Sequence, residues 1–477
     1  MNRTALLVVA LLALAGGVRL FHLDDRVVWF DEAVSLLVAK ASIPNIVAAA
    51  QDDTHSPFYY LALHFLPRGE LAARGFSVVC GVLTVALVFL IGCKLGCSHA
   101  APPACGMEAK RGSGAPRLQL LAGAVSAGLM ALCPLHVWYS QEVRMYALQT
   151  LLVTASWWLL FISLERPRLW IGYALAAALS LYAQYTSVFA LAAQWIYVLW
   201  FRRDVFRPWV LAQTGVALLF APCVPLFMHH LLGGTFGYWL GKFSWTDPFR
   251  FLALLSGAIP KNPGPYWPWV TLSIGLLIVS VIRQGKKALP LLLWLLAPVL
   301  LLALASLRAN AFLPRVLLMV TPSFALLVGC AAADKKGAVL AVALAAANLF
   351  ALQRYYFAEN LWTRSSLREA AQIVGRESKP SDAVMHSSRF SYRSFQFYLG
   401  DNVTQGLVRP GDDEPALYRV IGNGQLPSSA PRRIWLVLWP DFQQPGFHNQ
   451  VLAEMNARRP RHREVFSSPQ LLVMLYD

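Results

Sequence analysis

The sequence predicts a mainly α-helical, polytopic membrane protein that ends in a small α/β domain. Three observations support this prediction. The 477 residues are 57% hydrophobic and only 14% charged, whereas soluble domains carry about 25% charged residues. Apolar runs of about 20 residues recur along the chain, and a run of that length can cross the roughly 30 Å hydrocarbon core of a bilayer. From about residue 354 the composition becomes charged and typical of a soluble domain.

About eleven segments have the length and hydrophobicity of transmembrane helices. The first resembles a signal peptide, but its apolar run continues to about Phe21 without a clear small-residue cleavage site. This continuity favours an uncleaved first span. The predicted spans cover residues 4–21, 75–93, 118–137, 145–164, 169–185, 186–201, 208–228, 266–282, 288–306, 316–333 and 337–353.

Basic residues collect in short connections between these spans. If the N-terminus is cytoplasmic, five such connections fall on the cytoplasmic side, as the positive-inside rule requires. The net charge of +16 is thereby explained by topology, and no basic face with interleaved aromatic residues indicates nucleic-acid binding. The residues concerned are Lys94, Lys110, Arg111, Arg117, Arg166, Arg168, Arg202, Arg203, Arg207, Arg283, Lys286, Lys287, Lys335 and Lys336.

The same threading places a long first loop, residues 22–74, and the tail on the extracytoplasmic side. We expect a transmembrane domain over residues 1–353 and an extracytoplasmic α/β domain over residues 354–477. Residues 57–67 are apolar but too short to cross, which predicts an interfacial or partly inserted helix. Patterns typical of one amphipathic helix and three strands occur in the tail, in the segments SSLREAAQIVGRES, DAVMHSS, RIWLVLW and QLLVMLYD.

Charged residues recur beside the spans on the predicted extracytoplasmic side. Asp31 and Glu32 lie in VVWFDEAVSLL, where the apolar spacing predicts a helix with both carboxylates in its first turn. His55 follows in the same loop, and Glu142 and Arg144 lie between the third and fourth spans. The late arginines Arg308 and Arg315 lie in the short connection just before the tenth span.

Each position also has a simpler explanation. Asp31 suits an ordinary helix start, and Arg315 suits an interfacial anchor whose charged end reaches water. His55 suits a loop or core histidine, and Glu142 with Arg144 suits a local ion pair.

Together, these residues suit a substrate with an anionic head and a lipid tail. Arginine offers a forked set of donors for phosphate, and a nearby carboxylate can accept a proton from an attacking hydroxyl. The combination predicts group transfer from a lipid phosphate, in which Asp31 deprotonates the acceptor and arginine stabilises the departing phosphate charge.

Three motifs occur in a characteristic order: Trp-x-Asp-Glu at 29–32, His-x-Pro-x-Tyr-Tyr at 55–60 and Gln-Glu-x-Arg-x-Tyr at 141–146. Together they resemble the bacterial membrane glycosyltransferases related to protein O-mannosyltransferases, in the GT-C superfamily that also contains the lipid A aminoarabinose transferases. The resemblance covers roughly residues 18–200 and is weaker at FLPRVLLMVTPSFALL. It implies a GT-C fold, a polyprenyl-phosphate sugar donor and inversion at the anomeric carbon.

The resemblance also implies roles for individual residues. Asp31 matches the catalytic base, Glu32 supports it or contacts the acceptor, and Glu142 matches the second acidic position. The remaining positions are candidates for substrate binding: His55, Tyr60, Arg74, Arg144, Tyr146 and Arg315.

The sequence departs from the family pattern at two places. Ser56 stands where a proline often precedes Pro57, and Val316 stands where a tyrosine often follows the late arginine. Some GT-C enzymes bind a divalent cation through their acidic motifs. Asp31, His55 and Glu142 are the candidate ligands for such a cation here, although no cofactor is established by the sequence.

The implied location is a bacterial inner membrane, with the active site outside the cytoplasm. The expected partners are a polyprenyl-phosphate sugar, membrane lipid and an acceptor that is a lipid, a glycan or a protein. A transporter or flippase of lipid-linked sugars is an alternative, but its polar groups belong near the bilayer midplane, often in inverted repeats. A non-catalytic scaffold would not need paired acids beside the first span.

Overall fold

The computed structural model describes residues 3–96, 115–233, 242–259, 265–333, 336–357, 365–400, 403–408, 433–440 and 446–477. The chain divides into two compact units. The membrane unit comprises Met1–Phe21, Thr54–Ser56 and Arg74–Phe357, and the loop–tail unit comprises His22–Asp53, Pro57–Ala73 and Ala358–Asp477. The basic residues Lys110, Arg111 and Lys335 lie outside the described residues.

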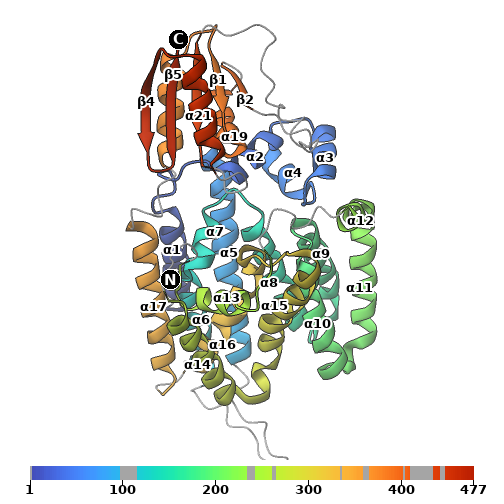
Figure 1. The fold of residues 1–477 in the computed structure, drawn as a ribbon. Coiled ribbons are helices and arrows are strands. Elements are labelled where there is room, and N and C mark those ends of the chain that lie inside the picture. Colours follow the sequence, from blue (N-terminus) through green and yellow to red (C-terminus); the bar gives the residue numbers. More distant parts are fainter. Residues whose placement is uncertain are drawn as a thin grey trace, which may run out of the picture. The chain divides into compact units, whose positions relative to one another are not determined.

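The membrane unit is a set of helices (Figure 1). Many of them are apolar. They are α1 (Arg3–Leu20), α5 (Glu70–Gly96), α6 (Ala115–Ala131), α7 (Pro134–Ser140), α8 (Tyr146–Ser163), α9 (Trp170–Ala183), α10 (Ser187–Phe201), α11 (Phe206–Phe220), α12 (Val224–Leu232), α13 (Asp247–Leu255), α14 (Trp267–Gln284), α15 (Leu289–Ala309), the 3₁₀ helix η6 (Pro314–Val320), α16 (Thr321–Ala331) and α17 (Ala338–Phe357).

The count of eleven spans is not confirmed. Among the described residues, seven helical stretches are long and apolar enough to cross a membrane, or eight if a bent pair is one span. Helices α9 and α10 have 14 and 15 residues, or about 21–23 Å at 1.5 Å per residue, which is shorter than the hydrocarbon core. Helices α14 and α15 form one stretch in that count, although the chain breaks between them at Gly285, where φ is +57°.

Contacts inside the membrane unit agree with the alternating directions of the threaded spans. At their N-terminal ends, α5 and α8 are linked because the Ser77 hydroxyl donates to the Glu142 carbonyl just before α8. At their C-terminal ends, Lys94 Nζ lies 2.6 Å from Glu165 Oε1. The two helices are therefore parallel neighbours, as the second and fourth spans should be.

A second set of contacts gives the same result. Arg283 donates to the Ala331 carbonyl, which joins the C-terminal ends of α14 and α16. The Tyr356 hydroxyl donates to the Val18 carbonyl, which joins the C-terminal ends of α17 and α1. Each of these pairs therefore consists of helices that end at the same side of the unit, as the threading predicts for two even-numbered or two odd-numbered spans.

The loop–tail unit contains a five-stranded mixed sheet in the order β2-β1-β3-β5-β4. β1 is parallel to both β2 and β3, and β5 is antiparallel to both β3 and β4. The unit consists of α2 (Phe30–Ala39), α3 (Ile43–Asp52), α4 (Phe58–His64), α18 (Ser365–Glu377), β1 (Ala383–His386), α19 (Arg389–Leu399), β2 (Thr404–Leu407), β3 (Ile434–Leu438), α21 (Phe447–Arg458), β4 (His462–Ser468) and β5 (Leu471–Tyr476).

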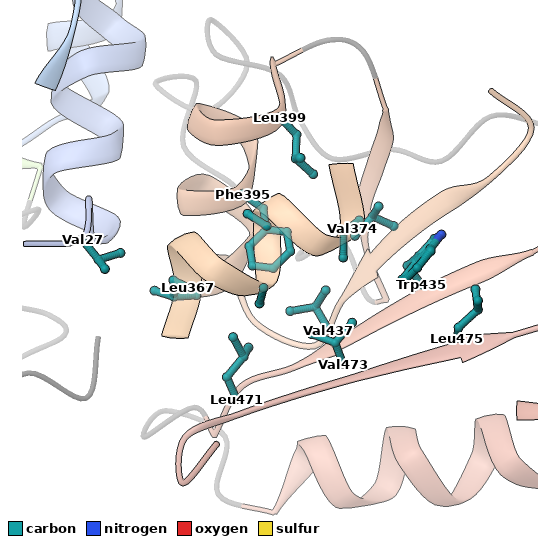
Figure 2. Packing of buried hydrophobic residues seen from close by; sticks show 13 residues of the cluster. Val27, Leu367, Val374, Phe395, Leu399, Trp435, Val437, Leu471, Val473 and Leu475 are labelled. Carbon is teal, nitrogen blue, oxygen red and sulfur yellow. The ribbon is translucent and has the colours of Figure 1, made fainter. Parts of the chain in front are cut away.

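Helices cover both faces of this sheet. One face buries a core that α18 and α19 share with β1, β3 and β5, around residues such as Leu367, Phe395 and Trp435 (Figure 2). The opposite face packs against α21 through Val451 and Leu436. The predicted small α/β domain is confirmed, together with its amphipathic helix and its three predicted strands. The sequence analysis did not predict α19, β2, α21 or β4.

An ion pair between the buried Asp382 and the partly exposed Arg433 stabilises the start of β1 and β3. Asp382 accepts hydrogen bonds from Arg433, at 2.6 Å and 3.1 Å, and from the Trp435 indole at 3.0 Å. Burial alone raises the pKa of a carboxyl, but hydrogen bonds from Arg433, the Lys379 backbone and Trp435 outweigh it and leave the pKa of Asp382 below its usual value. This pair ties the two central parallel strands together at one end.

Candidate functional site

The chain breaks where the third span was predicted to be continuous. Helices α6 and α7 meet at an angle of 62°, because Pro134 begins a new helix and cannot donate a backbone hydrogen bond to the old one. Such a break leaves carbonyls at the end of α6 without helical partners, and in a membrane these carbonyls need other donors.

Arg19 supplies those donors from the end of α1. Its guanidinium is fully buried and donates to the Ala131 carbonyl at 3.1 Å and the Met130 carbonyl at 3.4 Å. It also donates to His136 Nδ1 at 2.8 Å and to the Ser140 hydroxyl at 3.3 Å, both on α7. Arg19 therefore fixes the bend and the direction of α7. The sequence analysis did not select it, although an arginine inside an apolar span is itself a signal of function.

Gln141 fixes the next step of the chain. Its side-chain nitrogen donates to the carbonyls of Arg19 at 2.8 Å and Phe21 at 2.9 Å, and its oxygen accepts from the Tyr355 hydroxyl at 2.7 Å. The amide thus uses both of its polar atoms to hold the turn between α7 and α8. This turn presents Glu142 and Arg144.

Glu142 is buried, with 3% of its surface exposed. The Trp138 indole donates to its Oε1 at 2.7 Å, and its carbonyl accepts from the Ser77 hydroxyl at 2.8 Å. Arg74 is also buried and lies one helical turn before Ser77, on the same face of α5. Glu142 and the buried Arg74 therefore lie on adjacent elements, and their roles stay predictions from the resemblance.

Arg144, Tyr146, His55 and Arg315 come together from three separate parts of the chain. Arg144 Nη2 donates to His55 Nε2 at 2.9 Å, and since arginine has no acceptor, Nε2 is the acceptor. The Tyr146 ring lies near two guanidiniums, with Arg144 Cζ 5.9 Å and Arg315 Cζ 5.7 Å from its centroid. Both distances are within the range of cation–π attraction.

Arg315 lies on the 3₁₀ helix η6. A single span was predicted over residues 316–333, but the chain forms η6 before α16. The buried residues that follow Arg315 are held from both sides: the Trp294 indole donates to the Met319 carbonyl at 2.9 Å, and Gln149 of α8 donates to the Met319 sulfur. Irregular backbone is tolerated at membrane depth where protein surrounds it.

Three first-loop candidates, Asp31, Glu32 and Tyr60, belong to the loop–tail unit, whereas His55 and Arg74 belong to the membrane unit. Asp31 and Glu32 occupy the first turn of α2, as predicted, where carboxylates interact favourably with the helix dipole. Glu32 is 2% exposed, and the Asp31 carbonyl accepts from the Ser35 hydroxyl at 2.9 Å. Tyr60 is buried on α4, and its hydroxyl donates to Asp53. Residues 57–67, where an interfacial or partly inserted helix was predicted, thus contain the short helix α4.

The next feature is the predicted divalent-cation site. Among the described residues, no group of three histidine, cysteine, aspartate or glutamate side chains lies close enough together to hold a metal ion. Binding of a divalent cation by Asp31, His55 and Glu142 stays a prediction from the resemblance.

Comparison with known proteins identifies the fold. No family model and no curated protein sequence matches the chain. Two crystal structures of ArnT from Cupriavidus metallidurans, one bound to undecaprenyl phosphate and one in the apo state, are similar to it. In both cases the TM-score is 0.63 and the identity is 13%, over 99% of this chain and 98% of ArnT. ArnT is a lipid A aminoarabinose transferase with a GT-C fold, so the chain has the GT-C fold that its motifs predict.

Proposed function

We propose that this protein is a membrane glycosyltransferase that moves a sugar from a polyprenyl-phosphate donor to a hydroxyl acceptor outside the cytoplasm. The main support is the cluster of Arg144, Tyr146 and Arg315, with His55 hydrogen-bonded to Arg144, in an apolar helical unit. Two guanidiniums beside apolar helices suit a phosphate that carries a lipid chain. The similarity to ArnT bound to undecaprenyl phosphate supports the same class of ligand.

In the proposed reaction, the acceptor oxygen attacks the anomeric carbon and forms the new glycosidic bond. Asp31 takes the hydroxyl proton, and the bond from the anomeric carbon to the phosphate oxygen breaks. The polyprenyl phosphate leaves with the electron pair, and arginine stabilises its charge. A single displacement of this kind inverts the anomeric configuration. Glu32 supports Asp31, and Glu142 orients the arginines or the substrate.

Replacement of Asp31 tests the base. Asp31→Asn keeps the size of the side chain and removes the proton acceptor, so sugar transfer in membranes supplied with donor lipid should fall below detection. Asp25→Asn, at an exposed position of the same loop, is the matched control and should transfer normally. Normal transfer by a folded Asp31→Asn protein would remove Asp31 as the base.

Location can be tested independently of activity. A reporter that is active only outside the cytoplasm, fused after residue 360, should be active, whereas one fused after residue 166 should not. The reverse pattern would overturn the proposed orientation in the bacterial inner membrane and the extracytoplasmic position of the tail.

The acceptor is a glycolipid, a cell-envelope glycan or a protein. Mass spectrometry of lipid, glycan and protein fractions, from cells with the protein and from cells carrying Asp31→Asn, identifies which fraction gains the sugar. A mass difference confined to one fraction names the acceptor class and the sugar together.

A further inference from the structure

We propose that the C-terminal α/β domain is a positioning device for the catalytic motif in the first loop. The inference rests on the proposed function, because it takes Asp31 as the base. It is carried by contacts within the loop–tail unit, where α18 and α19 hold the chain segment that enters α2. These contacts come from three independent kinds of interaction: a polar clamp, a shared core and a helix–helix pair.

Arg368 of α18 is the polar clamp. Its Nη1 donates to the Asp24 carbonyl at 2.9 Å, and its Nη2 donates to the Arg26 carbonyl at 2.9 Å and to Glu70 Oε1 at 2.8 Å. Asp24 and Arg26 precede α2, whereas Glu70 lies near the other end of the first loop. One guanidinium therefore holds both ends of the loop that carries Asp31.

The segment before α2 is also part of the core of the domain. Val27 is buried in the same cluster as Leu367, toward which it points in Figure 2. The backbone N–H of the next residue, Val28, is buried and donates to the Tyr398 hydroxyl at 2.8 Å. Without Tyr398 this N–H would be buried without its acceptor, which is costly. Burial raises the pKa of Tyr398, which keeps the phenol neutral.

Helix α2 then runs alongside α19. Phe30 at the start of α2 contacts Phe390 at the start of α19, with ring centroids 4.9 Å apart. Lys40, just after α2, places its Nζ 5.1 Å from the ring centroid of Phe397 near the end of α19. The two helices are therefore parallel, and the first turn that carries Asp31 and Glu32 is in register with the first turn of α19.

These contacts determine the position of the base. Asp31 follows Phe30 directly and lies three residues beyond Val28, so a shift of either anchor moves its carboxylate. Displacement of a reacting group by about 1 Å can lower a rate roughly 100-fold. Loss of the clamp should accordingly lower kcat, while donor binding, which the proposal assigns to arginines of the membrane unit, should change little.

The test compares Arg368→Gln and Arg368→Lys with Arg463→Gln in the full-length protein. Arg463 pairs with Glu377 at 2.8 Å on the exposed side of the same domain, which makes it a matched control. We expect Arg368→Gln to lower kcat about 10-fold to 100-fold, with KM for the donor lipid within about 2-fold. Arg368→Lys should restore part of kcat, and Arg463→Gln should be unchanged.

Hydrogen exchange of the amides of residues 28–36 gives a readout that does not require activity. These amides should exchange faster in Arg368→Gln than in the wild type or in Arg463→Gln. Unchanged exchange, or faster exchange with normal kcat, would overturn the positioning role. If Arg368→Gln does not fold, Tyr398→Phe provides the same two readouts by removing the acceptor of the Val28 N–H and of Arg368 Nε. Full transfer by Asp31→Asn would instead remove the proposed base, and the exchange data would still test the clamp.

Discussion

Basic side chains have opposite environments at the two ends of the membrane unit. Helix α5 shows both environments, with Arg74 buried near its start and Lys94 in an ion pair with exposed Glu165 near its end, about 30 Å away. At the end that carries the basic loops, Arg202 pairs with exposed Asp204. At the other end, Arg19 and Arg144 are buried and donate to carbonyls and histidines.

The partly exposed basic residues bear on the orientation of the chain in the membrane, whereas the buried arginines belong to the candidate site. A basic residue in a loop contributes to orientation through its charge alone, so its contacts matter little and its neighbours are solvated. A buried guanidinium needs a partner for each donor, so its neighbours are fixed in place. Charge counting finds the first end, and only burial and hydrogen bonding identify the second as the candidate site.

The largest expected effect concerns two glutamates. Glu142→Gln should lower transfer about 1,000-fold, because the proposal gives its charge a role in the reaction and acid–base or charge effects have this size. Glu165→Gln at the opposite end should leave transfer unchanged, since Glu165 is exposed. Steady-state rates in proteoliposomes measure both. Equal losses of transfer rate in the two variants would show that the two ends do not differ in their importance for the reaction.

The next prediction compares how the replacement of two arginines changes the stability of the protein. Arg19→Met should lower the free energy of unfolding by about 3 kcal/mol or more, because the Met130 and Ala131 carbonyls lose a buried donor. Arg202→Met should cost roughly 0–1 kcal/mol, as partly exposed pairs do. Thermal unfolding in one detergent compares them. A small cost for Arg19→Met would show that the α6–α7 bend does not depend on it.

Two tyrosines beside arginines sharpen the contrast further. Tyr146→Leu removes the ring that contacts both Arg144 and Arg315, so KM for the donor lipid should rise about 10-fold, which corresponds to roughly 1.4 kcal/mol of cation–π attraction. Tyr197, beside Arg202 at the basic-loop end, is the control, and Tyr197→Leu should leave KM unchanged. A rise in KM for both would indicate a general loss of packing.

The smallest effect tests burial in the loop–tail unit. Burial lowers the pKa of His386 to about 3, so between about pH 6.5 and pH 3 the unfolded chain binds the proton and the folded chain does not. Stability should therefore fall as pH falls, by about 1 kcal/mol from about pH 7 to pH 5.5.

The control for that prediction is the exposed His462 on the edge strand β4. His386→Gln should flatten the pH dependence of hydrogen exchange in β1 and β3, and His462→Gln should preserve it. The same pH dependence in His386→Gln and the wild type would show that another group titrates.

Local patterns were sufficient to predict several parts of the structure. The periodic segment of α18 and the apolar runs of β3 and β5 specify their elements by themselves. Helix α19 was missed because its aromatic and serine residues have weak helix propensity; its start depends on the Ser388 cap, which accepts from the Phe390 N–H. Strand β4 is mostly polar and exposed, and it is defined by its pairing with β5.

The residues of the candidate site likewise form two groups: those that a local motif predicts and those that no local motif predicts. Its motif residues were found from local order, because each motif lies within a few positions. Arg19 stands out locally as an arginine inside an apolar span, but its role could not be predicted because its partners at Met130 and Ala131 are 111 and 112 positions away. The clamp at Arg368 was missed because it joins segments separated by more than 340 positions. No local pattern carries such pairings, which depend on how the whole chain packs.

The hydrogen bond from Val28 to Tyr398 has a consequence for the order of synthesis. Its partners are 370 positions apart, and at 5–20 residues per second the ribosome needs roughly 20–70 s to make the second after the first. Helix α2 is thus among the first elements made, yet it acquires its register only when the last domain folds. A chain released before Tyr398 would contain helices α1 to α17 and all three motifs, but it would lack the acceptor for the Val28 N–H. If the C-terminal domain has the proposed positioning role, such a chain should transfer the sugar more slowly than the complete chain.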